Sequence, residues 1–253
     1  MQIIYKKANT IDQIYCSTTQ IQLNSYIYEI IEQTNTAPVI KLKTQTERTP
    51  IMSSKQIKKK IESSKFFSGC IISLNNQIYI LCETRSLVHL NKGINAVNIK
   101  IGIQYNNKYD LMSLDFNYDN LIEKTCIVRE AYTLIDIKSA LLQQSVHSGE
   151  NVNIFYLNPN EDLLHHNFFK NSGQMICIYH PKIIDNKYIN PIIRTSQLIF
   201  NQTGIFDFKK TEKDLILVGC PLFYVSDQSL QLIGFIDKID DYITYFDIAL
   251  IKI

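Results

Sequence analysis

Short stretches in which apolar and polar residues alternate recur along most of the chain, separated by turn-forming residues. Ile, Val, Tyr and Phe are abundant in these stretches, and such β-branched and aromatic residues favour strands. The pattern therefore predicts an all-β protein. The expected strands lie near residues 2–5, 20–31, 69–73, 78–82, 96–103, 124–128, 151–157, 192–200, 204–208, 215–218, 221–225, 230–235 and 243–251.

Two hairpins are expected from this pattern. The first joins residues 69–73 to residues 78–82 through a four-residue loop, Leu74-Asn75-Asn76-Gln77. The second joins residues 221–225 to residues 230–235 through the polar turn at 226–229. Periodicity leaves residues 26–31 open, because they fit a strand or a helix.

Polar segments separate these elements. Residues 33–55 are rich in Thr, Lys, Gln, Ser and Pro, which is typical of a surface loop. The run Lys58-Lys59-Lys60 is interpreted as a solvated face, because no aromatic stacking platform is interleaved with it.

Composition limits the class of protein. A chain of 253 residues with 45% hydrophobic residues fits one large β-domain or two small ones with a real core. The 26 basic and 24 acidic residues give a formal net charge of +2. Such a balance does not favour nucleic acid or an anionic membrane as a partner.

The cysteines are not arranged as a metal site. Six are spread through the sequence without a Cys-x-x-Cys pair, and several lie in apolar stretches, where a thiol behaves as a small hydrophobe. His165-His166 with Glu161 and Asp162 resembles a ligand cluster, but adjacent residues of an extended chain point to opposite sides. We expect reduced thiols and neither a metal nor a cofactor.

No signal peptide and no membrane-length apolar run are recognised in the sequence. We therefore expect a soluble, intracellular protein. The chain ends in Ile251-Lys252-Ile253, which is not a peroxisomal address of the Ser-Lys-Leu type.

Three separated segments resemble the trypsin-like serine proteases. Ser-Gly-Cys-Ile-Ile-Ser at residues 68–73, followed by Ile-Leu-Cys at 80–82, is similar to the hairpin that precedes the catalytic histidine. Residues 173–181 resemble the start of the second barrel, and Val-Gly-Cys-Pro-Leu-Phe at 218–223 resembles the Ser-Gly-Gly-Pro-Leu-Phe segment of the nucleophile. The details are most similar to the inactive trypsin-like half of the peroxisomal leader peptide-processing proteases.

This resemblance implies a specific fold. It predicts two six-stranded antiparallel β-barrels of the chymotrypsin type, formed by residues 61–168 and 169–253. Residues 1–60 would be an N-terminal extension, partly loop.

The same resemblance implies that the catalytic side chains are lost. Arg85 takes the place of the histidine, and Val218 takes the place of the serine. Asn151 is the preferred match for the aspartate, and Asp136 is the competing match. Arg cannot act as a general base, because its guanidinium stays protonated at physiological pH, and Val carries no nucleophile.

We therefore predict a pseudoprotease that acts as a binding or regulatory module in protein processing. Its partner would be a protein or peptide, such as an active protease, and a peroxisomal location is implied by the family. One alternative is a cysteine protease of the same fold, with Cys220 as nucleophile and His89 or His180 as base. Another alternative is a structural β-protein unrelated to proteases.

Overall fold

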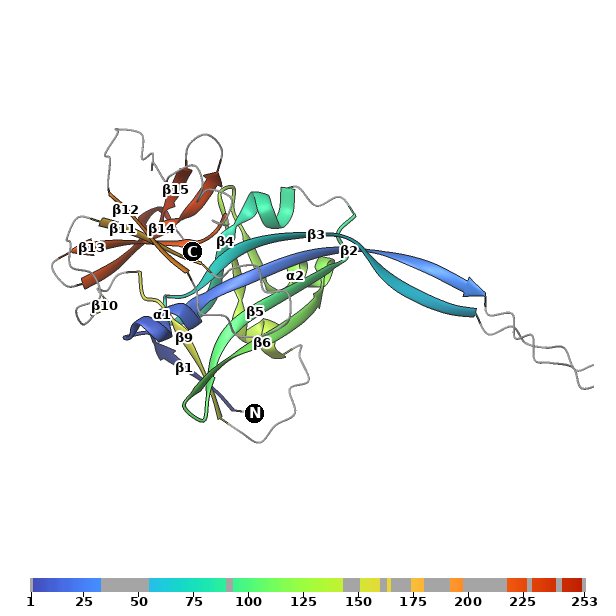
Figure 1. Cartoon of the computed structure of the whole chain (residues 1–253), viewed down its shortest axis with the longest axis horizontal. Helices are drawn as coiled ribbons and strands as arrows, with labels where there is room; N and C mark the ends of the chain where they lie inside the picture. The colour runs from blue at the N-terminus through green and yellow to red at the C-terminus, as the bar shows by residue number, and fades with distance from the viewer. Residues whose placement is uncertain are drawn as a thin grey trace, which may run out of the picture.

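The computed structural model describes residues 2–32, 55–89, 93–142, 151–159, 163–164, 174–179, 192–197, 218–226, 229–239 and 243–251. Most of these residues lie in β-strands that form two sheets (Figure 1). The predicted β-rich class is thus confirmed.

The first sheet has nine strands in the described chain. They are β1 (Gln2–Lys7), β2 (Thr18–Glu32), β3 (Lys55–Leu74), β4 (Gln77–Glu83), β5 (Ala96–Tyr105), β6 (Lys108–Asn117), β7 (Cys126–Val128), β8 (Tyr132–Asp136) and β9 (Asn151–Tyr156). Their order is β1-β9-β5-β2-β3-β4-β8-β7, with β6 paired to β5. β1 and β9 are parallel, so the sheet is mixed.

The second sheet has six strands in the described chain. They are β10 (Leu163–Leu164), β11 (Gln174–Tyr179), β12 (Ile192–Gln197), β13 (Pro221–Ser226), β14 (Ser229–Ile239) and β15 (Ile243–Asp247). Their order is β10-β14-β13-β11-β12, with β15 paired to β14, and all pairs are antiparallel.

Short helices connect the strands where a polar residue caps their first turn. They are α1 (Ile11–Ser17), the π-helical turn η1 (Arg85–His89), α2 (Tyr118–Thr125), α3 (Ile137–Leu142) and the 3₁₀ turn η3 (Ile248–Leu250). Asn117 accepts the backbone N–H of Asn120 at the start of α2 (3.1 Å), and Asp136 accepts those of Lys138 and Ser139 at the start of α3. Such caps satisfy amides that a helix leaves free.

The hairpin turn between β3 and β4 is tighter than predicted. β3 ends at Leu74 and β4 begins at Gln77, so the connection contains two residues instead of four. Asn75 and Asn76 both have positive φ angles, 50° and 63°. Asparagine tolerates this left-handed conformation, which a two-residue turn of this hand requires at both positions.

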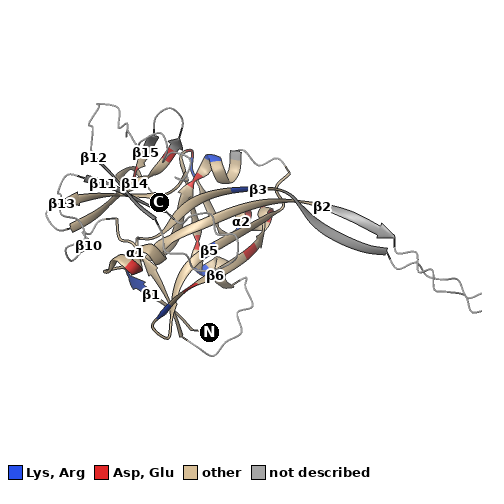
Figure 2. Ribbon diagram, viewed as in Figure 1, with Lys and Arg blue, Asp and Glu red and all other residues tan. Residues whose placement is uncertain are grey.

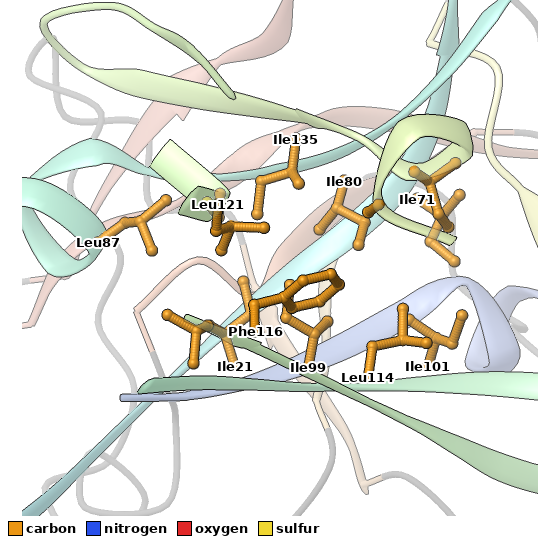
Figure 3. Close-up of a cluster of buried hydrophobic side chains, with 14 of the residues drawn as sticks. Ile21, Ile71, Ile80, Leu87, Ile99, Ile101, Leu114, Phe116, Leu121 and Ile135 are labelled. Atoms are coloured by element: carbon orange, nitrogen blue, oxygen red, sulfur yellow. The ribbon is translucent and has the colours of Figure 1, made fainter. Parts of the chain in front are cut away.

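A hydrophobic cluster fills the inside of the first sheet, which curls around it (Figure 3). Ile21, Ile99 and Leu114, from β2, β5 and β6, lie opposite Ile80 and Ile135, from β4 and β8. All five side chains are buried. Burial of one Leu or Ile contributes about 1.5–3 kcal/mol, so this cluster is a principal source of stability.

The curled sheet does not close through strand pairing in the described chain. β6 pairs with β5 and β7 pairs with β8, but no ladder joins β6 to β7 or β8 among the described strands. α2 connects β6 to β7 and contacts both strands, and its Leu121 side chain is buried in the cluster. A helix therefore covers the seam where a closed barrel would have a ladder.

A second hydrophobic cluster joins the two sheets. It combines Cys70 and Leu81 of the first sheet with Phe223, Leu232 and Phe235 of the second. The opposite faces of β3 and β4 thus serve two cores, one inside the first sheet and one between the sheets.

Several segments differ from the sequence-based expectation. The N-terminal residues are not an extension, because β1, α1 and β2 belong to the first sheet, and β2 pairs with β3 along its length. β6 and α2 occupy the Tyr/Asn/Asp-rich region that had no assigned element. Residues 26–31 continue strand β2, and residues 248–250 form η3 rather than the end of a strand.

The β2–β3 pair extends well beyond the rest of the sheet (Figure 1). β5 flanks β2 from Thr19 to Asn24, and β4 pairs with β3 from Gly69 to Leu74. Further out, the ladder between Tyr26–Glu32 and Lys55–Ile61 has no third strand in the described chain. We call this two-stranded segment the arm.

Candidate functional site at the junction of the two sheets

A turn from the second sheet docks on β3 of the first sheet through backbone groups. The turn comprises Val218 and Gly219, with Cys220 after it. The backbone N–H of Ser68 donates to the carbonyl oxygen of Val218 (2.7 Å), and the N–H of Gly219 donates to that of Ile236 in β14 (2.7 Å). The turn is therefore fixed between β3 and β14.

Gly219 is required at this place for two physical reasons. Its φ angle is +84°, a region that residues with a side chain rarely adopt. A Cβ atom at this position would also lie 1.9 Å from the carbonyl oxygen of Ser68. The Ser68 oxygen belongs to the backbone of β3 and cannot rotate away as a side chain could. A larger residue at position 219 would therefore have to push the two sheets apart.

Arg85 follows the end of β4, close to the level of Ser68, the residue of β3 to which the turn is bonded. Gly69 pairs with Cys82, so Ser68 is level with Glu83, two residues before Arg85. The structure therefore brings the segments of Arg85 and Val218 to the same end of the β3–β4 pair. The Arg85 side chain is exposed, and no hydrogen bond or ion pair joins its guanidinium to another described residue.

The buried carboxylate of Glu83 shapes this end of β4. It accepts the backbone N–H of Arg85 (2.7 Å) and that of Ser86 (2.5 Å). These bonds start the η1 turn and satisfy a charge that is almost completely buried. Glu83 is thus engaged in local backbone capping.

Neither predicted carboxylate position lies at the junction. Asp136 pairs with Tyr79, four residues before the end of β4 and about 13 Å away at the usual rise of a strand, and it caps α3. Asn151 is exposed at the start of β9, where it pairs with Gln2 of β1. The structure brings neither residue to Arg85.

Ala131 is the residue that lies beside the end of β4. Its carbonyl oxygen accepts the backbone N–H of Thr84 (3.2 Å). The Thr84 hydroxyl donates to the carbonyl oxygen of Arg129 (2.8 Å), which fixes the segment before β8. The sequence did not identify Ala131 as a neighbour of β4. The available signal was the alternation at Tyr132 and Leu134, which indicates a strand that begins just after Ala131.

Buried polar residues cross the sheet in a row level with the junction. Gln20 of β2 pairs with Ser68 on one side and with Lys100 of β5 on the other, and Glu83 continues the level on β4. All four are at least nine-tenths buried. The Ser68 hydroxyl donates to the Thr19 carbonyl oxygen (3.1 Å). The sequence signal for this row is the alternation of polar residues with buried Ile21 and Leu23, a pattern that by itself predicts only a strand.

Cys220 is completely buried and is close to a second thiol, that of Cys70. Burial, and then the neighbouring Cys220, raise the pKa of the Cys70 thiol well above its usual value. Burial also raises the pKa of Cys82, and it raises that of Cys126 to about 12. A thiol must become a thiolate to act as a nucleophile, so this environment favours inert cysteines.

The histidines add no base that the structure places at the turn. His89 ends η1, and its side chain lies outside the part of the chain that the structure describes. His180, and His165-His166 with Glu161 and Asp162, lie outside the described residues. Across the described part of the chain no group of three His, Cys, Asp or Glu side chains could hold a metal ion, and none of its helices is both long and apolar enough to cross a bilayer.

The junction is therefore a dry contact between two sheets, with an exposed Arg85 and a half-buried Val218 at its edge. Its chemistry among the described residues is that of hydrogen-bonded backbone, capped helix ends and buried thiols. No nucleophile paired with a base is seen in this part of the chain.

We expect Gly219→Ala to lower the free energy of unfolding by more than about 2 kcal/mol, because it combines a positive φ with a backbone clash. Gly93→Ala is the matched control, since Gly93 has a φ of +87° but no atom within 4 Å of the added Cβ. It should cost about 1 kcal/mol. Urea unfolding of both variants measures the difference, and equal losses would contradict the role of the Gly219 contact.

We expect Cys70, Cys82 and Cys220 to resist alkylation in the native protein and to react only on unfolding. Partly exposed Cys126 should be the first of the four to react, and slowly, because its raised pKa leaves little thiolate near neutral pH. Timed iodoacetamide labelling with peptide mass mapping measures the order. Rapid modification of Cys220 in the folded protein would instead support the cysteine-protease alternative.

Comparisons with known proteins do not assign this chain to a family. No protein-family model matches it, and no curated protein shows significant sequence similarity. The resemblance to trypsin-like proteases therefore rests on the short segments of the sequence.

Proposed function

We propose that the chain is a catalytically inactive protein of the trypsin-like protease fold, which acts as a binding or regulatory module in protein processing. The observation that carries this proposal is the placement of Arg85 and Val218 at one end of the β3–β4 pair. These two segments are 133 residues apart in the sequence, and we interpret their common position as that in which a protease of this fold would hold its base and its nucleophile.

The strand pairing supports a barrel ancestry. β2 is flanked by β3 and β5, the row continues through β4 and β8 on one side, and β6 follows β5 on the other. β7 follows β8 at the far edge, so a ladder between β6 and β7 would close this row of antiparallel strands. In the second sheet, five antiparallel strands follow in the order β12-β11-β13-β14-β15. We interpret both sheets as opened versions of six-stranded barrels.

The side chains at the junction support inactivity. A guanidinium cannot accept a proton near neutral pH, and a valine side chain has no group that attacks a carbonyl carbon. Ala131, beside the end of β4, cannot orient or charge-stabilise a base in the way a triad carboxylate does. Catalysis of this type needs a base, a nucleophile and an orienting carboxylate in hydrogen-bonding contact. In this proposal none of the three positions carries the side chain that its function requires.

The cysteine-protease alternative is less well supported. Cys220 lies next to the nucleophile's place, but its side chain has no accessible surface. A substrate carbonyl must come within van der Waals contact of the attacking sulfur, which a completely buried thiol does not permit.

A binding function is compatible with this architecture. Exposed sheet edges accept an extended peptide as an additional strand, and a scaffold that has lost its catalytic groups retains such edges. Within this proposal the chain takes the role of the inactive half of a peroxisomal processing protease. Its partner is a peptide or an active protease on another chain.

We expect the purified protein to be unreactive toward fluorophosphonate probes and to leave casein and fluorogenic peptides intact, because the junction offers no activated hydroxyl. Gel fluorescence after probe treatment and end-point peptide assays measure this, with trypsin as positive control. Labelling or cleavage that disappears on heat denaturation would contradict inactivity.

Restoring the three side chains tests the assignment of positions. We expect Arg85→His with Ala131→Asp and Val218→Ser to gain slow fluorophosphonate labelling, about tenfold or more above the wild type, because general-base assistance contributes about 10²–10⁴-fold in enzymes. The matched control replaces Ala131→Asp with Asn151→Asp and keeps the other two changes. Labelling of the control at the same rate would contradict the placement of Ala131 at the junction.

A further inference from the structure

Among the described strands, none pairs with either outer edge of the arm, and these two edges differ in sequence. On β2 it contains Tyr26-Ile27-Tyr28-Glu29-Ile30-Ile31-Glu32, and on β3 it contains the four lysines Lys55, Lys58, Lys59 and Lys60. A two-stranded ribbon is at best marginally stable alone in water. A further strand on one of its edges would add backbone hydrogen bonds to the ribbon.

The direction of the β2 edge can be derived from its contact with Asn95. The backbone N–H of Tyr26 donates to the Asn95 side-chain oxygen (3.2 Å), and the Asn95 side-chain nitrogen donates to the Tyr26 carbonyl (3.5 Å). Asn95 directly precedes β5, so these groups of Tyr26 point toward the β5 side of β2. Backbone groups alternate along a strand, and those of Tyr28 and Ile30 therefore point to the same, open side.

The register fixes the other edge by the same argument. Ile27 and Glu29 direct their backbone groups to β3, where they pair with Lys60 and Lys58. Lys59 lies between these two residues of β3, and Ile57 is two residues further along. The backbone groups of Lys59 and Ile57 therefore point to the outer side of β3. Ile30 and Ile57 are directly opposite each other, and each has its N–H on the outer edge of its own strand.

The two edges are not equally suited to pairing. Lysines on an edge strand hinder the addition of a further strand, and the β3 edge has four in six residues. A two-fold pairing of β3 edges about Ile57 would place Lys55 opposite Lys59 of the second copy, and like charges directly opposite are destabilising. The β2 edge has two charged residues from Tyr26 to Glu32, namely Glu29 and Glu32, and they pair with Lys58 and Lys55 of the same arm.

We propose that this chain forms a symmetric dimer in which the β2 edges of two arms pair antiparallel around Ile30. Ile30 then lies opposite Ile30 of the second copy, and Tyr28 lies opposite Glu32. No like charges face each other in this register. The product is a four-stranded sheet, β3-β2-β2-β3, whose outer edges are the lysine-bearing strands. An isologous contact of this kind closes at two copies.

Proline substitutions can distinguish the role of the β2 edge in dimerisation from that of the β3 edge. Proline lacks the N–H and is tolerated on an edge strand where that group faces outward. Ile30→Pro removes a bond of the proposed dimer ladder without removing a bond between β2 and β3. Ile57→Pro makes the same change on the opposite residue of the arm, at the lysine edge, and is the matched control.

Sedimentation velocity of the full chain over a micromolar concentration series measures the outcome. We expect a reversible dimer for the wild type, a dissociation constant raised at least about tenfold for Ile30→Pro, and a change below about threefold for Ile57→Pro. Thermal unfolding followed by circular dichroism should show that both variants remain folded. A wild type that is monomeric throughout, or equal effects of the two prolines, would overturn the proposal.

A second pair of variants serves if the prolines disturb folding. Tyr28→Lys places a lysine on the β2 edge, where it should hinder the addition of a further strand as the lysines of β3 do. This variant should also dissociate the dimer, whereas Ile61→Lys, on the β3 strand, should not. Assemblies larger than two copies would show that β2 pairs with β3 of the next molecule in an open chain, and would equally overturn a closed dimer.

Discussion

The close approach of the Val218–Gly219 turn to β3 is the contact on which the rest of the arrangement depends. Backbone meets backbone there, with the Ser68 N–H bonded to Val218 and no space for a Cβ at Gly219. Because the same turn is bonded to β14, it sets the distance between the sheets. The shared core of Cys70, Phe223 and Phe235 can pack only at that distance.

This contact also determines what chemistry the junction allows. Close packing excludes water, and in a dry environment a thiol remains neutral and a carboxylate needs several donors. Cys70, whose pKa is raised by burial, follows the first rule, and Glu83, which accepts two backbone N–H groups, follows the second. A catalytic site needs space for a substrate beside its nucleophile, whereas the space around Cys220 is filled by packing. Charged residues of both signs are interspersed on the rest of the molecule (Figure 2), in keeping with its small net charge.

The sequence predicted the elements whose signals are local. Alternation identified β4, β9 and β14, and the segments around Arg85 and Val218 were expected to meet. It missed β6 because polar residues on its exposed face hide the buried Leu114 and Phe116. The third position could not be found from sequence, because it depends on which segment lies beside the end of β4. Ala131 lies there, next to Thr84, whereas Asp136 opposes Tyr79 and Asn151 pairs with Gln2 of β1. Pairing between strands 50 residues apart is set by tertiary packing, which alternation does not encode.

In the arm, by contrast, the sequence predicts a strand where few contacts with the rest of the described structure support it. Alternation and β-branched residues continue along β2 to Glu32, although the last contact with β5 is made near Asn24 and Asn95. Local propensity therefore extends the strand beyond the region that packing stabilises. A two-stranded segment of this kind retains its ordered form at a cost in conformational entropy. Lysines protect one of its edges and leave the other open, so the sequence itself distinguishes a solvent-facing edge from one suited to a further strand.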